Sequence, residues 1–323
     1  MRRYILKRIG VSLLLIFGVT LTIFGIIRLL PGNPFLFMVN EHTDPAFLEQ
    51  QLQKIGYYDP LPIQYGKWLL RVLQLDFGYS IAHKLPVTQL IFDRLSNTLL
   101  LAVSSFVLST IISLIIGIAS ALYPNSVLDN IMTLFSFIGV SIPVFFFALL
   151  LIKVFGYNLD ILPFSGIETI GASYTGFERL LDIGKHMILP VTTSALTQTA
   201  VLMRYTRSAL VDTLSEDYIK TAQAKGMTKK QAIIKHGVKN VRVSIITVLM
   251  SKLPDLLSGA LIVETIFVWP GIGLLNFDAI QKQDYPLIMG ITLYITIVVI
   301  LCNLLSDILC IAVDPRIRYQ KET

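Results

Sequence analysis

Hydrophobic residues are gathered into long runs that polar segments separate. A helix needs about 20 mainly apolar residues to cross the hydrocarbon core of a bilayer. Six segments approach this requirement, although the fourth is shorter and rich in threonine; they lie at about 9–29, 98–122, 131–155, 187–203, 244–268 and 287–312. The pattern predicts an all-α integral membrane protein with six transmembrane helices.

The basic residues between these runs predict the orientation of the chain. Short cytoplasmic loops of membrane proteins retain Lys and Arg. Basic residues cluster before the first run, in the segment 204–243 and in the tail after 313, whereas the segments 31–97 and 156–186 are nearly balanced in charge. Both termini and the segment 204–243 are therefore expected in the cytoplasm.

This orientation divides the chain into four parts. We expect a first transmembrane helix at 1–30, an extracytoplasmic insertion of short helices at 31–97, a five-helix core at 98–313 and a cytoplasmic tail at 314–323. The first apolar run exceeds the roughly 7–15 residues of a signal-peptide core, and no small-residue cleavage site follows it. It is therefore expected to stay in the protein as a helix.

Composition agrees with a lipid environment. Hydrophobic residues make up 54% of the chain and charged residues only 15%, against about 25% charged residues in globular domains. The net charge of +6 does not indicate nucleic-acid binding, because the basic residues lie between apolar runs rather than on one face. Cys302 and Cys310 would lie about 12 Å apart on one helix, too far for a disulfide.

The cytoplasmic segment 204–243 carries local helix signals. Thr213 followed by Glu216 and Thr228 followed by Gln231 each fit a capping box. Gly226 lies between them, where a glycine can end a helix in the left-handed conformation. Two short helices meeting at Gly226 are predicted at about 214–225 and 229–239.

Pattern alone leaves two interpretations of this segment open. It could be a solvated loop that carries the cytoplasmic positive charge. It could instead dock into a groove on a soluble partner and pass a push into the neighbouring helices, with Ala232, Ile233 and His236 forming one narrow face of the second helix.

A resemblance favours the docking element. The stretch from Glu216 to Gly226 resembles the EAA loop of importer permeases of ATP-binding-cassette (ABC) systems, in the version found in oligopeptide and dipeptide permeases. Lys220-Thr221-Ala222 falls on the Glu-Ala-Ala triplet, with lysine in place of glutamate. The family's usual proline shortly after is absent, since Val243 and Ser244 stand there.

The resemblance extends along the whole chain. The stretches 2–34, 263–287 and 314–319 are similar to the corresponding parts of the B-type subunit of peptide permeases. Together, in this order and at this length, the motifs are far more specific than any one of them.

Membership of this family would imply the partners. A second homologous permease would complete the path, one or two ATP-binding subunits would dock on the EAA elbow, and an external binding protein would deliver peptide at a bacterial plasma membrane. The family's coupling residues fall here on Glu216, Asp217, Tyr218, Thr221, Ala222, Lys225 and Gly226. Relatives of this subunit also carry nickel chelates and glutathione.

The sequence bears directly on one of these implications. No G-x-x-x-x-G-K-[ST] phosphate loop occurs in the chain. If transport is driven by ATP, the nucleotide and its Mg²⁺ must be bound by other subunits, and no cofactor is expected in this one.

Ionisable residues inside apolar runs are candidates for a translocation path. The fifth run contains Lys252, Asp255 and Glu264, and the sixth contains Asp307. Lys252 and Asp255 are three residues apart, so they share a helix face and could form a structural ion pair. Alternatively, this face lines an aqueous path and meets the charged ends of a peptide.

Two other classes of function compete with an ABC permease. The charges within the apolar runs are compatible with an ion-coupled secondary transporter, but paired broken helices in matching halves are not evident. An intramembrane enzyme lacks support, because the chain has no G-x-S-x-G sequence and its histidines lack metal-ligand spacing.

Overall fold

The computed structural model describes residues 2–29, 53, 56–252 and 261–313, and these residues form helices joined by loops. The elements are α1 (Arg2–Leu29), α3 (Leu61–Leu73), α4 (Val87–Leu122), α5 (Val127–Ser141), α6 (Val144–Leu151), the π-helical η2 (Ile152–Asn158), α7 (Gly176–Asp212), the 3₁₀ turn η3 (Thr213–Ser215), α8 (Asp217–Ala224), α9 (Lys229–Ala232), the π-helical η4 (Ile233–Gly237), α10 (Val238–Ser251), α12 (Leu261–Ile266), α13 (Ile272–Gln281) and α14 (Tyr285–Val313). In this described part of the chain, antiparallel pairing is limited to the isolated bridge between Tyr79 and Pro86.

Three of the described helices are long and apolar enough to cross a membrane. Their apolar spans are Lys7–Ile26 in α1, Val87–Leu122 in α4 and Tyr285–Cys310 in α14. The pair formed by α5 with α6 and η2 would make a fourth span, bent by 104°. A helical membrane protein with several spans therefore fits the structure.

The predicted third span is broken rather than continuous. α5 ends at Ser141, and Ile142 and Pro143 adopt extended backbone angles before α6 begins. Proline lacks the amide hydrogen that a continuing helix needs, and it pushes the preceding residue out of the helical region. The bend at Ile142–Pro143 follows from this local chemistry.

The other two predicted spans lie in segments where the structure describes helix. The segment 187–203 lies inside α7, a helix of 37 residues that contains Pro190. In the segment 244–268, the structure describes the end of α10, up to Ser251, and α12 from Leu261; residues 253–260, and with them the continuity of the predicted helix, lie outside the described residues.

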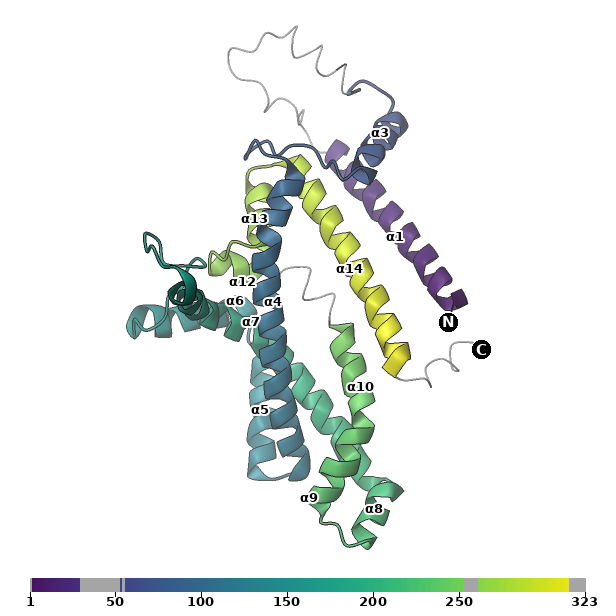
Figure 1. The fold of residues 1–323 in the computed structure, drawn as a ribbon, viewed down its shortest axis with the longest axis vertical. Helices are drawn as coiled ribbons and strands as arrows, with labels where there is room; N and C mark the ends of the chain where they lie inside the picture. The colour runs from purple at the N-terminus through teal and green to yellow at the C-terminus, as the bar shows by residue number, and fades with distance from the viewer. Residues whose placement is uncertain (1, 30–52, 54–55, 253–260, 314–323) are drawn as a thin grey trace.

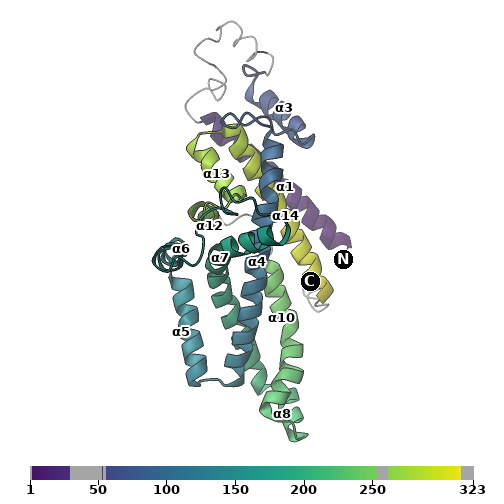
Figure 2. The same ribbon diagram turned by 60° about the vertical axis from the view of Figure 1, so that its left-hand side comes forward.

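α4 and α7 pack together closely along a line of small residues (Figures 1 and 2). On α4, buried small side chains recur every four residues, at Ser105, Ser109, Ser113, Gly117 and Ala121. A Cβ atom added to Gly117 would lie 2.9 Å from Cβ of Thr206 in α7 and 3.0 Å from the Met203 carbonyl oxygen. Small residues allow two helices to approach in this way in lipid, where van der Waals packing drives association.

Three apolar clusters hold the helices to one another. One joins α4, α13 and α14 around Val87, Ile91, Ile272 and Leu287. A second surrounds the fully buried Trp269 and Phe267. The third, at the end of the molecule where α8 lies, joins α4, α7 and α10 around Ala121, Leu210, Ile233, Val241 and Ile245.

Candidate functional site

Two short helices, α8 and α9, form an elbow at one end of the molecule (Figures 1 and 2). Gly226 lies between them with φ of 88°, a value that glycine adopts without steric cost. The Gly226 amide donates to the Gln223 carbonyl at 2.9 Å, and the Met227 amide donates to the Ala222 carbonyl at 3.2 Å. These bonds satisfy carbonyls that the end of α8 would otherwise leave without partners.

One of the two predicted capping boxes is present. The Gln231 amide donates to Oγ1 of Thr228 at 3.3 Å, and the Thr228 amide donates to Oε1 of Gln231 at 3.0 Å. The prediction of a box at Thr213 and Glu216 is wrong. The Thr213 hydroxyl donates to the Leu210 carbonyl at 2.7 Å, because α7 continues into the turn η3.

The second elbow helix does not end near 239 as predicted. α9 runs through the π-helical turn η4 directly into α10, which ends at Ser251. Ala232 and Ile233 are fully buried and His236 is half-buried, as their shared face suggested. Because Ile233 packs with Ala121 of α4 and Leu210 of α7, the elbow is joined to both long helices.

The structure divides the predicted coupling residues between an inner and an outer face of the elbow. Ala222 packs with Ile219 and Ala232 in a small buried cluster, and Tyr218 flanks it half-buried. The remaining ones are exposed: Glu216, Asp217, Thr221, Lys225 and Gly226. Lys220 forms an ion pair with Asp217 at 3.1 Å, but exposed pairs of this kind stabilise a helix little.

Close to the elbow, a buried ion pair joins α5 to α7. Arg207 donates to the Asp129 carboxylate through Nε at 2.5 Å and through Nη2 at 2.6 Å. The Asn125 amide also donates to this carboxylate at 2.8 Å. Sequence reasoning missed this pair, although Ser126 with Asp129 three residues later is a helix-start signal that marks the position.

Of the three candidate path residues, the structure describes Lys252 and Glu264. Lys252 is exposed at the end of α10, and Asp255 lies outside the described residues, as does any pairing between them. Glu264 is fully buried in α12.

The Glu264 carboxylate connects three helices. Its Oε2 accepts hydrogen bonds from the amides of Gly273 at 2.6 Å and Leu274 at 3.1 Å, at the start of α13. Its Oε1 accepts from the Thr98 hydroxyl of α4 at 3.0 Å, and Oγ1 of Thr98 in turn accepts from the Ile272 amide at 2.8 Å. A carboxylate at a helix N-terminus satisfies free amides and is favoured by the helix dipole.

A tight turn positions this carboxylate. Val268 has φ of 49°, and the Trp269 indole donates to the Asn97 carbonyl at 2.9 Å. A Cβ atom on Gly271 would collide with the Glu264 carboxylate, and one on Gly273 would lie 2.7 Å from Cα of Leu261. Only glycine lets the start of α13 approach α12 so closely.

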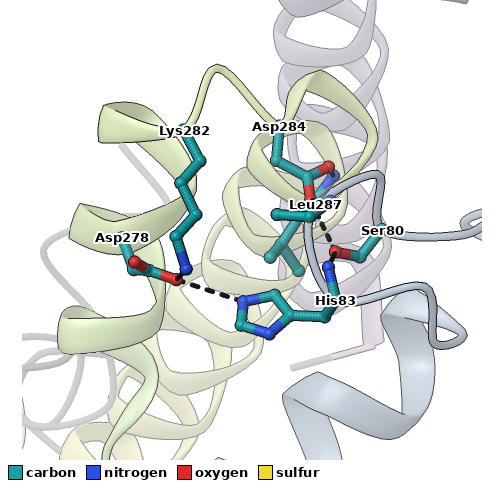
Figure 3. Close-up of polar contacts among 7 residues, drawn as sticks. Ser80, His83, Asp278, Lys282, Asp284 and Leu287 are labelled. Carbon is teal, nitrogen blue, oxygen red and sulfur yellow. Dashed lines mark hydrogen bonds and ion pairs between the residues drawn. The ribbon is translucent and has the colours of Figure 1, made fainter. Parts of the chain in front are cut away.

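A second buried carboxylate, Asp284, ties the loop before α4 to the start of α14 (Figure 3). It accepts hydrogen bonds from the Ser80 hydroxyl at 2.5 Å, the Ala82 amide at 3.0 Å and the Leu287 amide at 3.2 Å. The residue that follows in the loop, His83, reaches back to Ser80 through its amide at 2.9 Å. No local pattern in the sequence predicts these long-range contacts.

Beside this contact, Asp278 of α13 faces two basic side chains (Figure 3). Nε2 of His83 lies 3.1 Å from Oδ2 of Asp278, and Lys282 donates to the same oxygen at 2.8 Å. Burial raises the pKa of the Asp278 carboxyl, but the hydrogen bonds and charges of Lys282 and His83 outweigh it, so this pKa lies below its ordinary value. Within the described parts of the chain, His, Cys, Asp and Glu side chains form no group suited to a metal ion.

Comparison with known proteins covers almost the whole chain. Residues 113–319 match the family described as "Binding-protein-dependent transport system inner membrane component", and residues 1–102 match the N-terminal part described for the same kind of membrane component. The oligopeptide transport system permease protein AppB of Bacillus subtilis (strain 168) is 41% identical over 99% of this chain and 100% of the relative.

Other relatives are similar over the same extent. The glutathione transport system permease protein GsiC of Salmonella typhi is 34% identical over 99% of this chain and 100% of its own length. The dipeptide transport system permease protein DppB of Escherichia coli (strain K12) is 33% identical over 99% of this chain and 100% of its own length. The chain therefore belongs to the family of inner membrane components of binding-protein-dependent transport systems, and it is a transport permease subunit rather than an enzyme.

Proposed function

We propose that this chain forms, with a homologous second permease, the path of an ATP-driven importer for oligopeptides or dipeptides that an extracytoplasmic binding protein delivers. The similarity over nearly the full length to permeases named for oligopeptides, dipeptides and glutathione is the observation that carries this proposal. The named solutes share a peptide-like backbone, so a path suited to peptide groups accounts for all of them.

The elbow is the proposed docking element for one of the ATP-binding subunits. Most of its predicted coupling residues are exposed, whereas Ala222 and Ile233 face inward. A push on the exposed side would reach α4 and α7 through the cluster around Ile233 and Leu210. ATP and Mg²⁺ are proposed to bind to one or two partner ATPase subunits, which dock on such elbows.

Six membrane crossings are proposed from the order of the helices. α1, α4, the bent α5–α6 pair and α14 supply four of them, and α7 and the α10–α12 segment supply the other two. The basic residues near α1, on the elbow and in the tail support cytoplasmic termini in a bacterial plasma membrane. The insertion 31–97 and the tip of α13 then face outward.

The contacts of the carboxylates within the helices favour structural roles over an ion-coupled path. Glu264 accepts bonds from Thr98 and the start of α13, which favours a bridge between helices. Asp307 forms an ion pair with Arg8 at 2.7 Å, which holds α1 against α14. Lys252 and Asp255 stay candidates for the path in this proposal.

Purification of the tagged subunit from its native membrane in a mild detergent tests the proposal. Mass spectrometry should identify a second six-span permease and at least one ATPase with a phosphate loop. In reconstituted vesicles, peptide uptake should stop when ATP is removed and continue when an ionophore collapses the ion gradient. Uptake by this chain alone without ATP would contradict the proposal.

A further inference from the structure

The helix α3 has an apolar face that the rest of the described chain leaves uncovered. Ile63, Leu70 and Leu73 are 49%, 61% and 72% exposed, although a helix in a water-facing subdomain normally buries such residues. The same helix buries the polar Gln64, whose Nε2 donates to the carbonyls of Tyr57 and Asp59 at 2.7 Å. α3 thus exposes one apolar stripe, whereas Gln64 and Val72 are its buried residues.

Helical geometry places the exposed apolar residues on one stripe. At 100° per residue, Ile63, Gly66, Leu70 and Leu73 fall within about a quarter of the circumference. A Cβ atom on Gly66 would meet nothing within 4 Å, so the stripe is open there too. Lys67 and Arg71 border it on one side as an exposed cationic strip, in which Lys67 also forms an ion pair with Asp59 at 2.5 Å.

The opposite side of α3 packs against the second half of α1 (Figure 1). The Tyr65 hydroxyl is hydrogen-bonded to Oγ1 of Thr20 at 2.8 Å, and its ring lies 6.1 Å from that of Phe17 and 5.4 Å from that of Phe24. The Trp68 ring lies 6.0 Å from that of Phe24.

These contacts set the depth of α3, because the apolar span of α1 runs from Lys7 to Ile26. Phe17 is nine residues before Ile26, so it lies about 13 Å below the outer end of the span along the helix axis. Half of a bilayer's hydrocarbon core is about 15 Å thick. A helix whose tyrosine reaches Phe17 is therefore within reach of the acyl chains of that leaflet.

We propose that α3 is an interfacial helix that inserts Ile63, Leu70 and Leu73 into the lipid leaflet at the carboxyl end of α1. Arg71 extends toward the headgroups, as basic side chains at membrane surfaces do. Trp68, which packs on Phe24 near the end of the α1 span, lies at the depth where aromatic residues are enriched. The apolar stripe continues the lipid-facing surface of α1, where Leu13, Leu14 and Leu21 are also exposed.

Lipid accounts for the stripe without any protein partner, and this inference goes beyond the transport function. α3 would hold the start of the extracytoplasmic segment on the bilayer. The loop at Ser80, which is hydrogen-bonded to Asp284, would then stay at a fixed height above the bilayer.

Site-directed spin labelling in lipid nanodiscs tests the proposal with the assembled transporter. Leu70→Cys and Leu73→Cys are made in a background in which Cys302 and Cys310 are replaced by alanine. Arg71→Cys on the cationic strip is the matched control, and Ile170→Cys, at a side chain that is 99% exposed outside the helices, is the aqueous reference. Collisions with oxygen, which concentrates in lipid, are compared with those of water-soluble nickel ethylenediaminediacetate.

The proposal requires oxygen collisions to exceed nickel collisions at 70 and 73, with the order reversed at 170 and an intermediate ratio at 71. Nickel access at 70 and 73 would overturn it, since the stripe would then face water. Low access to both reagents would also overturn it, because the stripe would then be covered by protein, whether the binding protein, the second permease or the remainder of this chain.

A second measurement avoids labels at α3. The chain has two tryptophans, and Trp269 is fully buried, so Trp269→Phe leaves Trp68 as the reporter. Phosphatidylcholine brominated on the acyl chains should quench its fluorescence if the helix lies in the leaflet. Unchanged fluorescence would contradict the proposal.

Discussion

Replacing Glu264 by alanine should loosen the start of α13. The substitution removes the acceptor for the amides of Gly273 and Leu274 and for the Thr98 hydroxyl. A buried donor that loses its partner costs about 1–3 kcal/mol. The Thr98 hydroxyl can rotate toward another acceptor, so the two amides dominate the cost and together give about 2–6 kcal/mol.

Two effects set where the result falls within this range. Water that enters the space left by the side chain would satisfy part of the loss. Glu264→Gln keeps the shape and one acceptor oxygen but removes the charge, so it should cost less than alanine, about 1–3 kcal/mol. Thr265→Val is the matched control in the same helix, because the Thr265 hydroxyl donates within α12 to the Leu261 carbonyl.

The assay is hydrogen exchange of the purified transporter, read by mass spectrometry on peptides that cover 267–281, together with thermal unfolding in the same detergent. Exchange in α13 should be fastest in Glu264→Ala, slower in Glu264→Gln and slowest in the wild type. Thr265→Val should exchange like the wild type. Unchanged exchange in the alanine variant would refute the capping role of Glu264. A loss in thermal stability without faster exchange at α13 would place the damage elsewhere.

Three further changes probe the other contacts. Gly226→Val should reduce uptake and ATPase coupling while the protein still inserts, because φ of 88° is strained for a β-branched residue. Gly184→Val is the control, because an added Cβ at this helical glycine meets nothing within 4 Å. Normal uptake with Gly226→Val would exclude the coupling role. Arg207→Ala should destabilise the protein by about 3–5 kcal/mol because it leaves the Asp129 carboxylate buried without its cation. In thermal unfolding, the double variant with Asp129→Ala should recover part of this loss. Equal stability of the single variant and the wild type would contradict the argument. The pKa of Asp278 is lowered in the folded state, so its contribution to stability is present above the ordinary carboxyl pKa of 3.8 and is lost as the pH falls below that value toward the folded pKa. Asp278→Asn should flatten this part of the curve of stability against pH. An unchanged curve would show that the carboxyl contributes nothing to stability.

The sequence predicted the features that depend on neighbours in the chain. The apolar runs at 9–29, 98–122 and 287–312 lie in helices of the structure, since a helix in lipid satisfies its own backbone hydrogen bonds. The Thr228 capping box and the left-handed Gly226 follow from the local chemistry of those residues. In each case, the residues that predict the local structure lie within a few positions of it in the chain.

Local pattern failed where two local solutions competed. Thr213 and Glu216 fit a capping box, but the extension of α7 into η3 placed Thr213 within a turn that was already hydrogen-bonded. For the run 244–268, the structure describes α10 up to Ser251 and α12 from Leu261, and the residues between them lie outside the described part of the chain.

The sequence by itself determined that this is a helical membrane protein and where its elbow turns, because periodicity, glycine and capping chemistry act over a few residues; the resemblance of its motifs placed it among permease subunits. Only the tertiary structure decided which buried carboxylates have partners. Asp129 with Arg207, Glu264 with Thr98 and Asp284 with Ser80 join positions 78 to 204 residues apart. A charge in an apolar environment must be hydrogen-bonded, but which donor reaches it depends on how the helices pack, and no short stretch of sequence contains that information.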